Sequence, residues 1–135
     1  MEFNLRMLKE DDYDNILVNW WRDWRWVAPP KEMLPENGTG GLMVTKDGRD
    51  ICAGFIYFTN SKTAWSEWII SDFFYREDDR EEAVVFLVNA LTEICREKGM
   101  KFVFTVVKNE NLKKKYEQCG FVVGDENSTE MTKII

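Results

Sequence analysis

The sequence contains no histidine, which excludes imidazole general bases, histidine-based catalytic triads and histidine metal sites. It has only three cysteines, Cys52, Cys95 and Cys119, without CxxC spacing, so we expect reduced thiols rather than disulfides or a zinc site. No apolar run is long enough to span a membrane, and residues 1–10 lack the apolar stretch of a signal peptide. We therefore expect a soluble, cytoplasmic protein without a membrane partner.

Positive charge is also scarce. The 18 Lys and Arg residues are outnumbered by 24 Asp and Glu residues, which gives a net charge of −6. Because nucleic-acid binding requires cations that neutralise phosphates, we do not expect a nucleic-acid partner, whereas an amine-bearing partner suits this field. The length of 135 residues fits one domain, 1–135, and the six tryptophans supply aromatic surface for packing or for a binding site.

The hydrophobic pattern predicts an order of strands and helices along the whole chain. An alternating start at 3–7 predicts a strand, and an apolar stripe that includes three tryptophans predicts a helix. A segment rich in proline and glycine predicts a long loop with at most one helical turn. The expected elements are a first strand, helix 11–24, loop 25–41, strands 42–46, 51–59 and 64–74, helix 83–98, strand 102–107, a helix ending at Gly120, and strands 121–123 and 131–135.

Local signals refine this order. Asp47-Gly48 predicts a hairpin turn, and Gly54 inside an apolar strand predicts a bulge. Asp79 followed by Glu82 is typical of a capping box at the start of the long helix. The continuous apolar run at 102–107 predicts a central strand. Together these features predict an α/β (α+β) domain with a mixed, mostly antiparallel central sheet flanked by helices, in which a helical crossover creates one parallel pairing.

The segment NENLKKKYEQCGF at residues 109–121 resembles the carboxy-terminal motif of the acyl-CoA N-acyltransferase (GNAT) superfamily. The element order resembles the same superfamily along nearly the whole chain, and the wider sequence is similar to GNAT-like proteins encoded by bacteriophages. The resemblance implies the GNAT fold and acetyl-CoA as co-substrate. It also implies that Asn109 contacts the CoA arm and that Tyr116 protonates the departing thiolate; alternatively, Tyr116 is a core aromatic residue.

The superfamily also carries an Arg/Gln-x-x-Gly-x-Gly/Ala turn that offers backbone N–H groups to the CoA pyrophosphate. Arg76 matches the first position of this turn, whereas Asp79 and Glu81 stand where glycines are expected. By resemblance, the turn from Arg76 through Asp79 and Arg80 holds the pyrophosphate. The alternative is a capped helix start whose side chains and five carboxylates (77, 78, 79, 81 and 82) repel a diphosphate.

Acylation of an amine needs a base for the amine proton and an acid for the thiolate. Without histidine, the base must be a carboxylate. Glu67 lies on the third strand of the meander, where several family members carry a catalytic Glu, and Asp72 near the end of that strand is a second candidate. Each is alternatively a solvated strand residue. Trp26 falls outside the apolar stripe of the first helix and, with Arg22 and Arg25, is a candidate for lining a pocket for a flat or cationic acceptor. The run Lys113-Lys114-Lys115 is either a solvated helix face or a contact for the 3′-phosphate of CoA.

The leading hypothesis is transfer of an acetyl group from acetyl-CoA to a small-molecule or protein-borne amine. Two alternatives stay open at this point: a GNAT-like binding or accessory module that has lost CoA binding, and a nucleobase-modifying enzyme. A homodimer also stays open.

Overall fold

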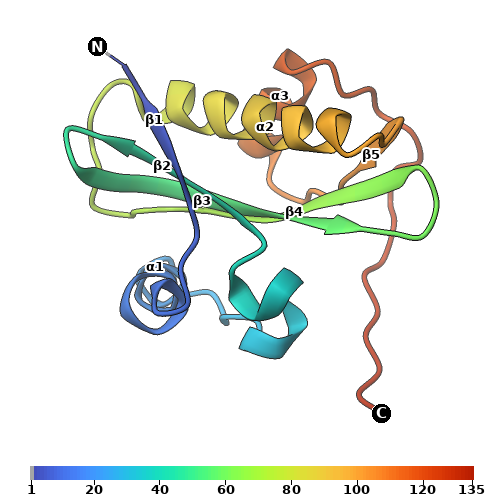
Figure 1. Ribbon diagram of the computed structural model, residues 1–135, viewed down its shortest axis with the longest axis horizontal. Helices are drawn as coiled ribbons and strands as arrows, with labels where there is room; N and C mark the ends of the chain where they lie inside the picture. The colour runs from blue at the N-terminus through green and yellow to red at the C-terminus, as the bar shows by residue number, and fades with distance from the viewer. Residues whose placement is uncertain (1) are drawn as a thin grey trace.

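The computed structural model describes residues 2–135 as one mixed sheet with helices on both faces (Figure 1). The strand order in the sheet follows the chain, β1-β2-β3-β4-β5, with every neighbouring pair antiparallel except the parallel pair β4–β5. The elements are β1 (Asn4–Met7), η1 (Tyr13–Leu17), α1 (Val18–Asp23), η2 (Lys31–Met33), η3 (Pro35–Gly38), β2 (Gly41–Lys46), β3 (Arg49–Phe58), β4 (Thr63–Ser71), α2 (Arg80–Glu97), β5 (Phe102–Phe104) and α3 (Glu110–Gln118).

The predicted architecture is confirmed, including the antiparallel meander and the parallel crossover pairing. The Asp47-Gly48 turn has the two positive φ angles, 52° and 78°, that a tight hairpin of this hand requires. The bulge predicted at Gly54 lies instead on the neighbouring strand, because Trp68 and Ile69 of β4 stand opposite Gly54 alone, between the pairs Ala53–Ile70 and Phe55–Glu67. Glycine is still needed on β3, since a Cβ atom on Gly54 would lie 2.5 Å from Ile69 Cδ1 and 3.0 Å from Leu91 Cδ1 of α2.

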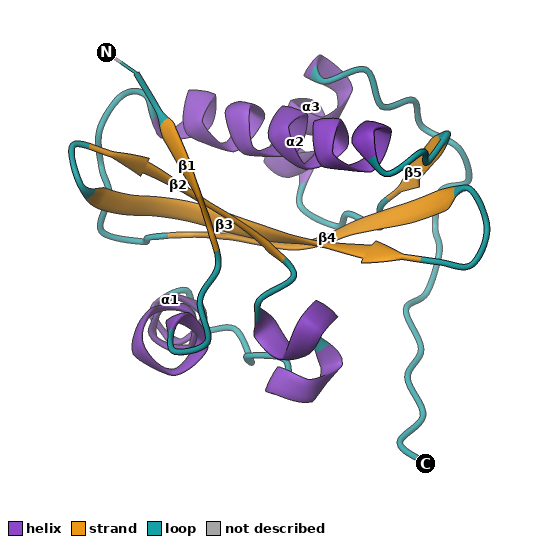
Figure 2. Ribbon diagram, in the orientation of Figure 1, coloured by secondary structure: helices purple, strands orange, loops and turns teal. Residues whose placement is uncertain are grey.

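Helices lie on both sides of the sheet (Figure 2), and two apolar cores hold these layers together. On one face, α2 buries Leu87, Val88 and Leu91 against the strands, and α3 adds Tyr116. On the other face, α1 buries Trp20 and Trp21. Each apolar side chain buried in this way contributes about 1.5–3 kcal/mol. Among residues 2–135, no helix combines the length and the apolar composition that crossing a membrane demands.

Four further expectations about local structure need correction. The helix expected at 11–24 is present but divided into a π-turn, η1, and α1, and the 25–41 segment holds two short 3-10 turns where at most one helical turn was expected. The strand expected at 102–107 is limited to three residues and lies at the sheet edge. Residues 121–123 and 131–135 form no strands, and several of their apolar side chains are exposed. The edge position follows from this, because no later segment pairs with β5.

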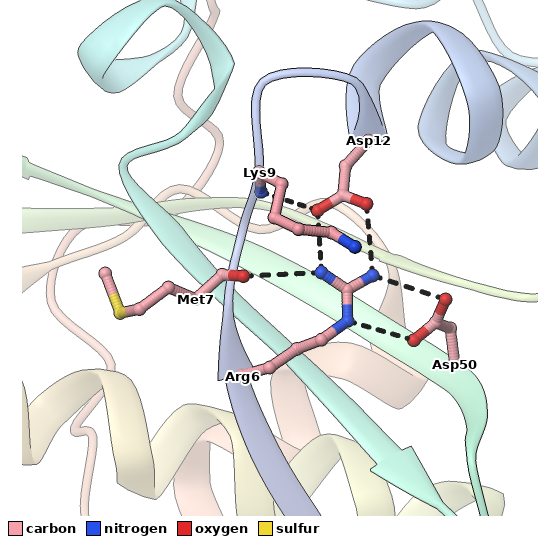
Figure 3. Close-up of polar contacts among 5 residues, drawn as sticks. All are labelled: Arg6, Met7, Lys9, Asp12 and Asp50. Atoms are coloured by element: carbon pink, nitrogen blue, oxygen red, sulfur yellow. Dashed lines mark hydrogen bonds and ion pairs between the residues drawn. The ribbon is translucent and has the colours of Figure 1, made fainter.

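A polar network joins β1, the turn after it and β3 (Figure 3). The Arg6 guanidinium donates to both carboxylate oxygens of Asp12, at 2.8 and 3.0 Å, and to both oxygens of Asp50 at 3.3 Å. The Lys9 backbone N–H also donates to Asp12, at 2.6 Å. Although burial alone would raise the pKa of Asp12, these donors lower it, so the buried carboxylate stays ionised. The network fixes where η1, the first helical segment, starts relative to the sheet.

Gly41 allows the closest approach of β2 to β3. A Cβ atom at Gly41 would fall on the carbonyl oxygen of Gly54, far inside van der Waals contact. We expect Gly41→Ala to lower the free energy of unfolding by about 1–3 kcal/mol or more, measured by urea denaturation. Gly124→Ala is the matched control, because a Cβ atom added at Gly124 would meet no other atom within 4 Å; equal stability of the two variants would contradict the prediction.

Candidate functional site

The parallel strands β4 and β5 separate soon after they begin. They pair at three positions, the last of which is Trp65 with Phe104. Beyond that point, side chains bridge the gap: Thr105 Oγ1 donates to the Ser66 carbonyl at 2.6 Å, and the Val106 N–H donates to Glu67 Oε2 at 2.9 Å. Trp68 has a φ of 61°, a strained value for a bulky residue, and together with Ile69 it forms a bulge in β4 opposite Gly54.

Glu67 lies at this gap, on the sheet face opposite α2, and its carboxylate is half-buried. Burial raises the pKa of Glu67 to about 7, while the Val106 N–H lowers it and the Glu130 carboxylate raises it. A carboxyl group with such a pKa is partly ionised near neutral pH, which suits a general base.

Tyr116 reaches the same gap from the other face of the sheet. Its side chain is 2% exposed, packs edge-on against Phe121, and places its hydroxyl 3.0 Å from Ser66 Oγ. Burial raises the pKa of Tyr116, so the hydroxyl keeps its proton. Tyr116 is therefore a core residue with a polar end directed at β4. The neighbouring residues Ser66 and Glu67 point to opposite faces, and the gap between the strands lies beside both.

A cleft of about 440 Å³ lies at the amino-terminal end of α2, and neither Glu67 nor Tyr116 is among the residues that line it. The second half of β4, the loop before α2, the start of α3 and the loop after α1 form its walls. The predicted cofactor residues Arg76, Arg80 and Asn109 line it, together with Trp24, Trp26, Ile69, Ile70, Ser71, Tyr75, Glu77, Asp78, Glu81, Val84, Asn111, Leu112 and Lys115.

The two arginines of the cleft are held by aromatic rings rather than by carboxylates. Arg80 stacks over Trp24 at 4.9 Å and donates to the Tyr75 carbonyl at 3.2 Å, and Arg76 stacks over Phe73 at 4.5 Å. Within residues 2–135 neither arginine forms an ion pair. Burial and the charge of Arg76 lower the pKa of Arg80. Because the two guanidinium groups repel each other, an anion bound between them would be stabilised.

Asp79 turns away from the cleft. It occupies the position before α2, but its side chain makes no capping bond, so the predicted capping box is wrong. Lys46 donates to one of its oxygens and the Tyr75 hydroxyl donates to the other at 2.7 Å. This ion pair, followed by the hydrogen bond from Tyr75, lowers the pKa of Asp79. Its charge is therefore neutralised locally, and its side chain is not part of the cleft lining.

The remaining candidates are divided among different places. Asn109 caps α3 by accepting from the Leu112 N–H at 3.0 Å and also lines the cleft. Asp72 is not brought together with Glu67, because it accepts from Arg49 at 3.2 Å and from the Phe74 N–H at 2.9 Å in a separate shallow pocket. Trp26 lines the cleft and stacks on Trp24 with ring centroids 5.3 Å apart.

Sequence reasoning missed Ser66 and Thr105. Because side chains alternate along a strand, the sequence does place Ser66 and Glu67 on opposite faces of the sheet. It gives no sign, however, that Ser66 contacts Tyr116. Within the described part of the chain, no group of three side chains is arranged to hold a metal ion.

Comparison of the chain with protein-family models and with curated proteins gives no match. Among solved structures, it is similar to glucosamine-6-phosphate N-acetyltransferase from Arabidopsis thaliana, with 19% identity, a TM-score of 0.64 and coverage of 99% of both chains. It is also similar to the ribosomal-protein-S18-alanine N-acetyltransferase from Escherichia coli, with 16% identity and a TM-score of 0.68 over 92% of this chain and 80% of that chain.

A third similar structure is N-acetylglutamate synthase from Neisseria gonorrhoeae, complexed with coenzyme A and L-arginine. The identity is 13% and the TM-score 0.72, over 96% of this chain and 29% of that one. The chain has the GNAT fold. The GNAT fold predicted from residues 109–121 and from the element order is thus confirmed, and a fold by itself leaves the reaction to be argued from the site.

Proposed function

We propose that the protein transfers an acetyl group from acetyl-CoA to a primary amine. The observation that carries this proposal is the placement of Glu67 and Tyr116 on opposite faces of the sheet beside the gap between β4 and β5, Glu67 bonded to the Val106 N–H and Tyr116 to Ser66. Glu67 has a pKa of about 7, which suits a base, and the Tyr116 hydroxyl is protonated at neutral pH and so has a proton to donate. Proteins with the same fold are named as N-acetyltransferases, which supports the choice of reaction.

The cleft supports the proposed donor. Arg76 and Arg80 would hold the pyrophosphate beside the amino-terminal end of α2, where the first N–H groups of a helix have no intrahelical acceptor. The cleft is lined by three basic and three acidic residues. One of the acidic residues is already paired, since Lys115 Nζ lies 3.7 Å from Glu81 Oε1. Because Asp79 is paired elsewhere, the acidic turn repels a diphosphate less than its composition indicates. Asn109 would contact the pantetheine arm.

The residues present can perform each proton transfer. The amine nitrogen attacks the thioester carbon, a C–N bond forms and the C–S bond breaks. Glu67 takes the proton that the nitrogen loses, directly or through a water molecule. Tyr116 gives its proton to the departing thiolate, and solvent restores both groups afterwards. The acceptor is a small-molecule or protein-borne amine.

Titration with acetyl-CoA by calorimetry tests the donor site. We expect micromolar binding to the wild-type protein, and we expect Arg80→Gln or Arg76→Gln to weaken it about ten- to a hundred-fold, since each removes a charged hydrogen-bond donor. Arg96→Gln is the matched control, because Arg96 lies at the far end of α2 and pairs with Glu93.

A folded wild-type protein that gives no heat at high acetyl-CoA concentration would contradict the proposal. The second candidate, a GNAT-like accessory module, would then be favoured by the side chains at positions 79 and 81, where glycines are expected. A nucleobase substrate is a weaker third candidate because of the net charge of −6. Similarity to phage-encoded proteins and a homodimer stay predictions.

A further inference from the structure

The sheet face opposite α2 carries exposed aromatic side chains beside Glu67. We define this aromatic face by Trp65, Phe102 and Phe104. Phe102 and Phe104 are 64% and 56% exposed, and the rings of Trp65 and Phe104 lie 5.1 Å apart. The facing is set by alternation along β5, because Val103 between them packs into the core under α2. Exposed apolar clusters of this kind mark binding surfaces.

Glu67 borders this aromatic face with a free oxygen. It follows Trp65 by two residues on β4 and therefore shares its face. Its Oε2 atom accepts from the Val106 N–H, whereas Oε1 has no hydrogen bond within residues 2–135. No side-chain oxygen or nitrogen of the described residues is buried without a hydrogen bond, so Oε1 reaches solvent. A ligand N–H on this face can therefore bond to Oε1.

The surroundings of the aromatic face are rigid and offer few other polar partners. Tyr57 on β3 pairs with Trp65, and its hydroxyl is occupied: it donates to the Met33 carbonyl at 2.8 Å and accepts from Trp68 Nε1 at 2.7 Å. A second carboxylate near Glu67 belongs to Glu130, whose Oε1 atom lies 3.6 Å from Lys108 Nζ in an exposed ion pair. Glu67 Oε1 is therefore the carboxylate oxygen that borders Trp65 and Phe104 on this face.

We infer that the acceptor is a primary amine attached through a short linker to an aromatic or similarly flat apolar group, which packs on Trp65 and Phe104 while its nitrogen meets Glu67 Oε1. This inference rests on the proposed function and narrows its substrate class. A sugar amine would gain little from packing on this apolar surface, whereas a flat apolar group would bury it. The charge of Glu67 selects an amine over a neutral apolar ligand.

Acetyl transfer to two amines measures this preference. With acetyl-CoA at pH 8, we expect kcat/KM for 2-phenylethylamine to exceed that for ethylamine by about ten-fold or more. Phe104→Ser should reduce the ratio to about two-fold or less. Phe58→Ser is the matched control, because Phe58 is 45% exposed and alternation from the buried Ile56 places it on the α2 face; it should keep the wild-type ratio.

Calorimetry with acetyl-CoA on the same preparation separates the inference from the proposed function. If acetyl-CoA binds and both amines react equally well, the inference is wrong and the proposed function stands. If acetyl-CoA does not bind, both fall. Sedimentation velocity examines the competing occupant: a wild-type dimer that Phe104→Ser converts to monomer would show that a second copy covers the aromatic face, and would also overturn the inference.

Discussion

Glu67→Gln should lower kcat/KM for acetyl transfer about 100- to 1,000-fold, because general-base catalysis contributes on that scale. Glutamine keeps an oxygen that can accept from the Val106 N–H, so the gap between β4 and β5 should keep its geometry. The loss would therefore report the missing base. Glu97→Gln, at an exposed position near the end of α2, is the matched control and should leave the rate unchanged.

The pH profile gives this prediction its second readout. With a pKa of about 7, Glu67 gains its basic form as the pH rises through neutrality, so wild-type kcat/KM should increase between pH 6 and pH 8. That increase should vanish in Glu67→Gln. A retained increase, or a rate equal to that of the wild type, would remove Glu67 from the mechanism.

The contribution of Glu67 to the free energy of unfolding should fall with rising pH, whereas its contribution to the rate should increase. Burial raises the pKa of Glu67 above its unfolded value of 4.5, so folding favours the protonated form. The stability that protonation contributes is present in full below the unfolded pKa and is lost as the pH rises through about 7. At pH 8 Glu67→Gln should therefore be at least as stable as the wild type, so thermal unfolding separates a lost base from a damaged fold.

Tyr116→Phe should lower kcat about 100-fold while the protein stays folded, because it removes the proposed acid and keeps the ring that packs on Phe121. The hydroxyl contributes one hydrogen bond to Ser66, so we expect a stability loss of about 1 kcal/mol. The KM for acetyl-CoA should change little, since Arg76 and Arg80 are untouched.

Ser66→Ala is the matched control for Tyr116→Phe, because it breaks the same hydrogen bond and leaves the phenol in place. The two variants should lose similar stability in thermal unfolding and differ widely in the release of CoA thiol. Equal turnover in both variants would mean that the Tyr116 hydroxyl serves only the core.

Features set by neighbouring residues could be predicted from the sequence. The turn at Asp47-Gly48 and the end of α3 at Gly120 depend on backbone conformations that few residues adopt. The buried face of α2 could also be predicted, because its apolar residues recur with the 3.6-residue period of a helix. The resemblance at residues 109–121 then connected these local elements to one fold.

Features set by distant partners could not be predicted. The sequence places Asp79 before a helix, but Lys46, 33 residues earlier, competes with the capping position for its carboxylate. The run at 102–107 has the composition of a central strand, yet centrality depends on whether the last residues of the chain pair with it. The contact between Tyr116 and Ser66 spans 50 residues and required the fold to be known.

The arrangement of Tyr116 and Glu67 on opposite faces of one sheet bears on the order of substrate binding. If acetyl transfer occurs at the gap between β4 and β5, the nucleotide-bearing donor enters from the α2 side and the amine from the aromatic face. Neither substrate then blocks the path of the other, and no covalent acetyl-enzyme is needed to carry the group between two visits to one pocket. This arrangement favours a ternary complex of protein, acetyl-CoA and amine in which either substrate can bind first.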